Sequence, residues 1–286
     1  MRIPAVLMLL PTAQLAAQAS TDIYLVSITT RTPSPGFGRA KNITARSGYD
    51  NQPFFTPDGH AILYTSMREG QADTYRYDVA RGTTSRVTAT RESEYSPTIM
   101  PGDTTFSVVR VEMDSTQRLW LFDLDGSQPR LLLENVKPVG YHAWGDENTV
   151  ALFVLGDPPT LQLADTRTGE TRILARDIGR SLHKVPGRAA ISFLHRVSAN
   201  DAWISELDLE WHTIRRLIRA LPQNEFYAWM PDGTLVTAAG SKLFTWKEGQ
   251  HDSWREAADF ADVGIGPISR IAVSPEGDML ALVSQH

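Results

Sequence analysis

The hydrophobic positions along this chain occur in short runs separated by turn residues, and helical spacing is nearly absent. The clearest example spans residues 52–78, where runs of apolar and aromatic residues flank Pro57-Asp58-Gly59. Proline restricts φ and glycine tolerates positive φ, so this tripeptide favours a tight turn between two strands. A second turn at Gly70 leads into a third run. The pattern predicts strand, turn, strand, turn, strand.

Related turns recur at intervals of about 44 residues, the spacing of four-stranded propeller blades. After the first turn they are Pro101-Gly102-Asp103, Gly145-Asp146-Glu147, Pro186-Gly187-Arg188, Pro231-Asp232-Gly233 and Pro275-Glu276-Gly277. Apolar runs too short for helices flank each of them. A fourth strand is expected after turns such as Asp125-Gly126 and Thr168-Gly169. The repeats predict an all-β fold, a six-bladed β-propeller.

The two chain ends are expected to build one shared blade. The sixth repeat has room for only two strands, while residues 22–26 and 41–44 carry the pattern of the missing third and fourth strands. A ring closed in this way leaves no long unpaired sheet edge. Residues 20–286 are therefore predicted to form one domain. Its blades are expected at about residues 45–89, 90–135, 136–177, 178–221 and 222–261, with 262–286 and 20–44 together forming the sixth.

Composition narrows the classes of partner. The chain has 286 residues, is 42% hydrophobic and carries a formal net charge of −5. Nucleic-acid binding depends on clustered Lys and Arg, so a nucleic-acid partner is not expected. Because the sequence contains no cysteine, neither disulfides nor a lipid-anchored cysteine is expected.

The first 19 residues have the pattern of a secretory signal peptide. Arg2 is followed by an apolar segment, residues 3–10, and Ala17-Gln18-Ala19 forms a small-residue cleavage site before Ser20. The apolar segment is too short to span a bilayer. The pattern predicts a periplasmic or secreted protein that starts at Ser20 and has no membrane span. A disordered or anchoring N-terminus is the alternative.

The first repeat resembles that of the TolB-type propellers, the WD-like repeats of the periplasmic Tol translocation protein. Similar repeats occur in the propeller domains of prolyl-oligopeptidase-type enzymes. The residues that carry the resemblance are Gln52, Pro53, Phe55, Thr56, Pro57, Asp58, Gly59, Ile62, Tyr64, Ser66, Arg68, Gly70 and Tyr75. The resemblance implies a propeller whose relatives mostly serve as binding scaffolds. Neither the α/β domain that precedes the Tol propeller nor a hydrolase domain is expected, which argues against a role in the Tol system.

The innermost strand of each propeller blade lines the central channel, so residues five or six positions before each turn should surround one channel mouth. With close neighbours, the candidate ligand-binding residues are Tyr49, Asp50, Asn51, Glu94, Tyr95, Tyr141, His142, Ser181, His183, Glu225, Tyr227 and Arg270. The same rule places Gln52, Ser96, Gly140, Arg180, Phe226 and Ser269 at this mouth. Their chemistry suits a small polar ligand or a peptide. The alternative is a water-filled mouth with no dedicated ligand.

No catalytic motif is predicted. Ser181 and Lys184 match a Ser-x-x-Lys pattern, but that pattern requires a helix, and residues three apart on a strand face opposite sides. His142 and His183 could join Glu94 or Glu225 in a zinc site, yet their spacing is not diagnostic. No metal and no other cofactor is therefore expected.

The prediction is a non-catalytic binding or protein-interaction scaffold whose partner is a protein, a peptide or a small polar ligand. Two alternatives remain open. One is a hydrolase or lyase with a site at the channel mouth, built from Glu94, His142, His183, Glu225 and Arg270. The other is a structural envelope protein with no ligand at the mouth. Phe55, Trp144, Trp229 and Val273 precede their turns at matching positions and are interpreted as core between blades.

Overall fold

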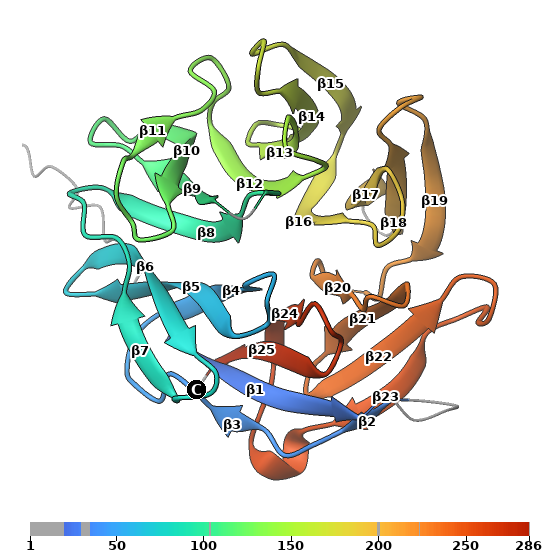
Figure 1. Cartoon of the computed structure of the whole chain (residues 1–286). Helices are drawn as coiled ribbons and strands as arrows, with labels where there is room; N and C mark the ends of the chain where they lie inside the picture. The colour runs from blue at the N-terminus through green and yellow to red at the C-terminus, as the bar shows by residue number, and fades with distance from the viewer. Residues whose placement is uncertain (1–19, 30–34, 103, 199–200, 223, 286) are drawn as a thin grey trace, which may run out of the picture.

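Six antiparallel β-sheets lie in a ring around a central axis (Figure 1). The computed structural model describes residues 20–29, 35–102, 104–198, 201–222 and 224–285. The all-β, six-bladed propeller predicted from the repeats is confirmed. The predicted signal peptide lies outside the described residues.

Five blades each contain four strands in sequential order, with the first strand nearest the axis (Figure 1). Blade 1 consists of β4 (Asp50–Phe55), β5 (Ala61–Arg68), β6 (Gln71–Asp78) and β7 (Thr83–Arg86). Blade 2 consists of β8 (Ser93–Ile99), β9 (Thr105–Val111), β10 (Gln117–Asp123) and β11 (Arg130–Leu131). Blade 3 consists of β12 (Val139–Trp144), β13 (Thr149–Val154), β14 (Thr160–Asp165) and β15 (Thr171–Arg176).

The next two blades continue the ring. Blade 4 consists of β16 (Ile178–Lys184), β17 (Ala190–Ser198), β18 (Asp201–Asp208) and β19 (Ile214–Arg219). Blade 5 consists of β20 (Tyr227–Trp229), β21 (Thr234–Ala239), β22 (Lys242–Lys247) and β23 (Arg255–Asp259). A 3-10 turn, η1 (Ala261–Val263), precedes the sixth blade.

Blade 6 contains strands from both ends of the chain. It is built from β24 (Ile268–Val273), β25 (Met279–Gln285) and β1 (Thr21–Thr29), with β2 (Gly36–Phe37) and β3 (Lys41–Asn42) both paired to β1. The β1–β25 pairing runs from Thr21 opposite Gln285 to Ser27 opposite Met279. The predicted closure by the two chain ends is therefore confirmed.

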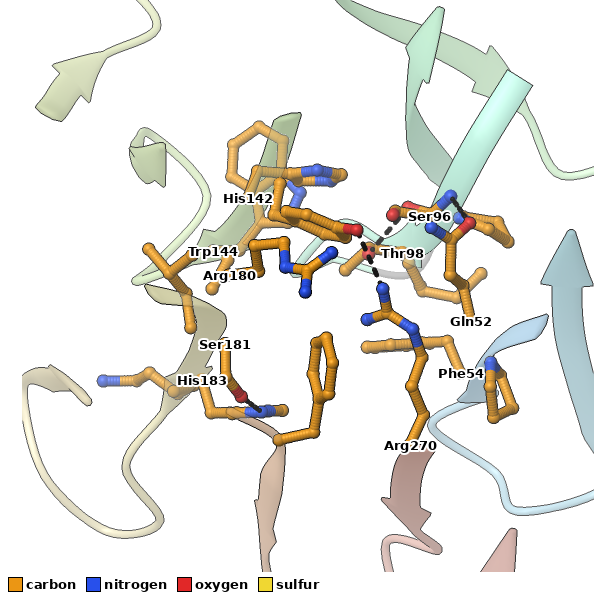
Figure 2. A pocket seen from close by; sticks show the side chains of 18 of the residues that line it. Gln52, Phe54, Ser96, Thr98, His142, Trp144, Arg180, Ser181, His183 and Arg270 are labelled. Atoms are coloured by element: carbon orange, nitrogen blue, oxygen red, sulfur yellow. Dashed lines mark hydrogen bonds between the residues drawn. The ribbon is translucent and has the colours of Figure 1, made fainter. Parts of the chain in front are cut away.

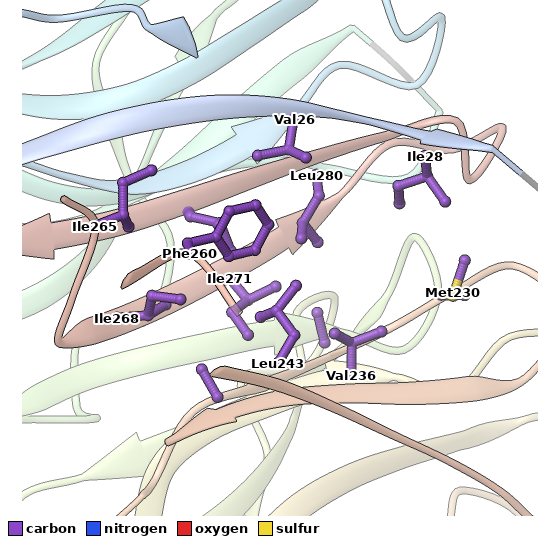
Figure 3. Close-up of a cluster of buried hydrophobic side chains, with 13 residues drawn as sticks. Val26, Ile28, Met230, Val236, Leu243, Phe260, Ile265, Ile268, Ile271 and Leu280 are labelled. Atoms are coloured by element: carbon purple, nitrogen blue, oxygen red, sulfur yellow. The ribbon is translucent and has the colours of Figure 1, made fainter. Parts of the chain in front are cut away.

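The core lies between neighbouring sheets. Figure 3 shows one such cluster, in which Val26 and Leu280 of blade 6 pack with Val236 and Leu243 of blade 5. All four side chains are completely buried. Burial of such a side chain contributes about 1.5–3 kcal/mol, so each blade is stabilised by its neighbours.

Within the described ranges, no helix is long and apolar enough to cross a membrane.

Candidate functional site

A pocket of about 470 Å³ occupies the central channel, and side chains from all six blades line it (Figure 2). One residue near the start of each inner strand contributes to the wall at the equivalent blade position. These residues are Gln52, Ser96, Tyr141, Ser181, Phe226 and Arg270. The pocket is therefore assembled from all six blades of the ring.

Two of these pocket residues, Gln52 and Ser96, have an unusual backbone conformation. Gln52 and Ser96 have φ values of 57° and 55°, in the left-handed region that residues other than glycine rarely adopt. Both lie where the inner strand slips register against its neighbour, between Asn51 and Phe54 in blade 1 and between Tyr95 and Thr98 in blade 2. Strained backbone of this kind is concentrated at functional sites in proteins.

The pocket wall is cationic although the whole chain is acidic. Its charged side chains, among the described residues, are Arg180, Lys184, Arg270 and Asp146. Arg180 Nε forms an ion pair with Glu225 Oε2 at 2.8 Å. Arg270 Nη2 donates a hydrogen bond to the Tyr141 hydroxyl at 2.8 Å. Figure 2 shows the guanidinium groups of Arg180 and Arg270 directed into the middle of the pocket.

Aromatic rings hold both arginines. The Arg270 guanidinium carbon lies 4.1 Å from the Phe226 ring centroid and 5.0 Å from that of Tyr141. The Arg180 guanidinium carbon lies 5.6 Å from the same Phe226 ring. Cation–π contacts at these distances fix a guanidinium group while its edge stays free to donate hydrogen bonds.

A sequence model of the TolB beta propeller domain matches residues 12–154, which is half of the chain. The chain belongs to the TolB β-propeller family. No curated protein sequence matches it significantly.

Solved structures agree with this TolB-type fold. A proposed TolB from Agrobacterium tumefaciens is 16% identical and superposes with a TM-score of 0.73 over 94% of this chain and 99% of that one. The TolB of Acinetobacter baumannii is 17% identical, with a TM-score of 0.60 over 92% of this chain and 63% of that one. The oligogalacturonate lyase of Vibrio parahaemolyticus is 12% identical, with a TM-score of 0.56 over 94% and 98% of the two chains. At these identities the likeness shows the fold alone.

Half of the residues selected from the sequence line the pocket of this TolB-type propeller. They are Tyr141, His142, Ser181, His183, Tyr227 and Arg270. The remaining candidates, which are not among the lining residues, are Tyr49, Asp50, Asn51, Glu94, Tyr95 and Glu225. Glu225 still acts on the pocket, because it holds Arg180 and also pairs with Arg196.

Two of the three acidic candidates, Glu94 and Asp50, are buried and do not line the pocket. Glu94 is completely buried and accepts hydrogen bonds from the hydroxyls of Thr88 and Thr90. Burial raises its pKa, in opposition to those bonds and to the Arg110 charge. Asp50 is also completely buried, 3.4 Å from Arg46 Nε. Neither carboxylate can reach a ligand in the channel without a rearrangement of the blade.

Tyr49 lies near the channel cations. Burial raises the pKa of its phenol to about 12, and the charge of Arg270 opposes that increase. The phenol is therefore neutral at physiological pH and can serve only as a hydrogen-bonding group.

The two pocket histidines have different partners. His142 Nε2 lies 2.6 Å from Ser107 Oγ of blade 2, and burial lowers the pKa of His142 to about 3. His183 Nε2 lies 2.9 Å from Ser181 Oγ on the same strand. Burial, followed by the charge of Arg270, lowers the pKa of His183 to about 4. Both imidazoles are therefore neutral at pH 7.

The two histidines do not gather with carboxylates. Across the described ranges, no group of three or more His, Cys, Asp or Glu side chains could hold a metal ion. Glu94 binds threonines and Glu225 binds arginines, so neither completes the zinc site considered from the sequence.

Several lining residues were not selected from the sequence as site residues. They include Phe54, Thr98, Trp144, Asp146 and Lys184, together with the prolines Pro53, Pro97 and Pro101. Phe54 and Thr98 follow Gln52 and Ser96 across an irregularity of the inner strand, so regular strand alternation could not have identified them. Trp144 was interpreted as core, and it is both buried and part of the pocket wall.

Proposed function

We propose that this protein is a periplasmic or secreted, non-catalytic TolB-type propeller whose channel pocket binds a protein segment, a peptide or a small polar ligand. The observation that supports this function best is the pocket itself, which combines aromatic walls with two arginines in the middle. Binding pockets are typically concave and largely apolar, with a few convergent polar groups. The volume of about 470 Å³ suits a few residues of peptide.

Ser181 and His183 form a serine–histidine pair in the pocket wall, and the chemistry of this pair supports a binding role. A serine nucleophile needs a base whose pKa lies near the working pH. The pKa of His183, lowered to about 4, makes this imidazole a poor proton acceptor. A hydrolase or lyase at the same pocket remains the second candidate, because the 2.9 Å contact between Ser181 Oγ and His183 Nε2 has the geometry of a nucleophile and base.

Affinity capture with variant proteins tests the binding function. The protein, starting at Ser20, is immobilised beside Arg180→Trp and Arg130→Trp and exposed to envelope and culture fractions. Arg180→Trp fills the channel mouth while Glu225 keeps Arg196. Arg130→Trp is the matched control, since its side chain is 50% exposed against 51% for Arg180 and it also pairs with a carboxylate, Asp123.

The proposal predicts a partner that the wild type and Arg130→Trp retain and that Arg180→Trp loses. If all three proteins retain the partner, the partner binds outside the channel. Turnover of a captured compound that is abolished by Ser181→Ala would replace the binding role with the enzymatic one. Capture of nothing would favour the structural envelope alternative.

A further inference from the structure

Arg270 has no anionic partner among the described residues. No carboxylate oxygen there lies within 4.0 Å of its guanidinium nitrogens, and its guanidinium donates a hydrogen bond to the Tyr141 hydroxyl. By contrast, Arg180 pairs with Glu225, and Lys184 donates to the backbone carbonyl of Arg188. A guanidinium group carries five N–H donors, so most of the donors of Arg270 are available to a ligand.

The protein holds this charge in place before any ligand arrives. The Arg270 guanidinium stacks between Phe226 and Tyr141, and the bond to Tyr141 fixes its orientation. The Arg180 guanidinium also contacts the Phe226 ring. Two guanidinium groups beside one ring repel each other, and an anion placed between them relieves that repulsion. A preorganised, partly desolvated cation of this kind binds an anion at low entropic cost.

Two further polar side chains, Gln52 and Ser96, lie in the pocket wall. Gln52 Oε1 accepts from Thr65 Oγ1 and from the Ser96 backbone N–H, both at 2.8 Å, which turns the Gln52 amide nitrogen away from them. The hydroxyl oxygen of Ser96 is buried and makes no hydrogen bond in the described part of the chain. Buried polar groups are normally satisfied, so a polar group of a ligand or a bound water is expected to complete the hydrogen bonding of the Ser96 hydroxyl.

We infer that the channel pocket recognises a carboxylate, which Arg270 binds and Arg180 flanks, while the apolar group next to that carboxylate packs on Phe54, Phe226 and Trp144. This inference rests on the proposed binding function. The planar fork of Arg270 matches a carboxylate in a two-bond geometry. Polyphosphates fit less well, because Glu225 already offsets one of the two arginines and the chain is acidic overall.

The carboxylate has two chemical sources, the C-terminus of a peptide and a free small acid. Titration calorimetry at fixed ionic strength separates them with four probes. The peptide pair is acetyl-Gly-Ala-Phe with a free C-terminus and the same peptide as a C-terminal amide. The small-molecule pair is N-acetylphenylalanine and its amide. In each pair, the amide lacks the negative charge of the acid and keeps the same apolar group.

A hydrogen bond to a charged group contributes about 1.5–3 kcal/mol, so at least one acid should bind the wild type about tenfold or more tightly than its amide. Arg270→Met should abolish that preference, and Arg270→Lys should keep only part of it. Arg216→Met is the matched control, because Arg216 also stacks on an aromatic ring, Trp203, without an ion pair among the described residues, and it lies outside this pocket. It should keep the full preference.

The comparison of acid with amide uses the wild-type protein, so it stands even if a variant folds poorly. Tighter binding of only the peptide acid assigns the site to a chain terminus, and comparable preference for both acids assigns it to carboxylates in general. Equal affinity for acid and amide, or an unchanged preference in Arg270→Met, would overturn the inference. If acid and amide bind equally and Arg180→Trp abolishes both, the channel function stands and only the carboxylate recognition fails. No saturable binding of any probe would also overturn carboxylate recognition, while the capture experiment decides the function separately.

Discussion

At the scale of single residues, two of the contacts between neighbouring blades each contain a serine that contacts two inner-strand side chains. Ser107 on β9 lies 2.6 Å from His142 Nε2 and accepts a bond from Trp144 Nε1 at 2.9 Å. Ser192 on β17 is bound in the same way by the Tyr227 hydroxyl at 3.0 Å and by Trp229 Nε1 at 2.8 Å. His142 and Tyr227 thus occupy equivalent positions, which identifies His142 as a packing residue of the blade contact.

The buried His142 predicts a loss of stability in acid. Its pKa is about 3 in the folded protein and about 6.5 in the unfolded chain, so the unfolded chain takes up a proton first as the pH falls. Stability is therefore lost progressively from about pH 6.5 toward pH 3. At pH 4.5 the His142 contribution to this loss should be roughly 2–3 kcal/mol relative to pH 7.

Urea unfolding from pH 7 to pH 4.5 measures this contribution in the wild type and in His142→Gln, which keeps a polar group near Ser107. Between pH 7 and pH 4.5 the free energy of unfolding of His142→Gln should fall less than that of the wild type, and the difference should equal the His142 contribution. His60→Gln, at an exposed turn, is the control and should follow the wild type. Parallel curves for the wild type and His142→Gln would contradict the assignment of a buried, neutral imidazole.

The residue scale also shows what the sequence could and could not identify at the site. Counting back from each turn located Tyr141, Ser181 and Arg270, because the turn fixes the register of the inner strand. It also selected Tyr95 and Glu225, since adjacent strand residues face opposite sides and a two-residue window includes both. The burial of Glu94 depends on Thr88 and Thr90 in the connection before β8 and on Arg110 of the paired strand β9, and the repeat pattern does not show how that connection folds back onto Glu94.

At the scale of elements, the turns that join the third and fourth strands of blades 2 and 3 each contain a glycine, but the two glycines have different neighbours. Gly126 in blade 2 and Gly169 in blade 3 have φ values of 83° and 74°. A Cβ atom on Gly126 would lie 2.0 Å from the carbonyl oxygen of Val87, which belongs to blade 1. A Cβ atom on Gly169 would meet nothing within 4 Å. The turn of blade 2 is therefore part of a blade contact, whereas that of blade 3 is open.

This difference predicts unequal effects of alanine. Gly169→Ala should cost only the left-handed backbone penalty, about 1–2 kcal/mol. Gly126→Ala should cost at least about 2 kcal/mol more, because backbone of the neighbouring blade must shift. Chemical denaturation of both variants provides the comparison, and equal losses of stability would contradict the blade contact.

Among the elements, the inner three strands of each blade could be predicted from the apolar runs and the spacing of the turns. The short hairpin of β2 with β1 was not anticipated, because Gly36 and Phe37 lie in a segment rich in proline and glycine that reads as a loop. The outer strand β11 is also shorter than its apolar sequence indicated, since only Arg130 and Leu131 pair with β10. Outer strands contact one neighbour only, so side-chain pattern constrains them least.

At the scale of the whole molecule, the ring depends on β1. This strand pairs with β25 along seven residues and buries Ile23 and Val26 completely in the contacts with blades 1 and 5. Loss of β1 would expose both these apolar surfaces and the edge of β25. This closure could be predicted from the sequence because the sixth repeat has room for only two strands, and the two N-terminal strands belong to no other repeat. One blade shared by the two chain ends accounts for both facts.

A chain that lacks residues 20–44 should therefore aggregate or become sensitive to protease, and a smaller change should show the same dependence. Ile23→Ala should lower stability by about 2–5 kcal/mol. Ile173→Ala is the control, since Ile173 is 49% exposed, and its effect should be much smaller. A truncated protein that stays monomeric with an unchanged melting midpoint would refute the role of β1 in closing the ring.

The binding role of the channel is tested most directly by hydrogen–deuterium exchange of the wild-type protein with and without the partner retained in the capture experiment. The account predicts slower exchange in the inner-strand segments 96–99, 141–144 and 180–184, whose side chains line the pocket. Protection confined to the outer strands β7, β11, β15 and β19, with inner strands unchanged, would contradict it.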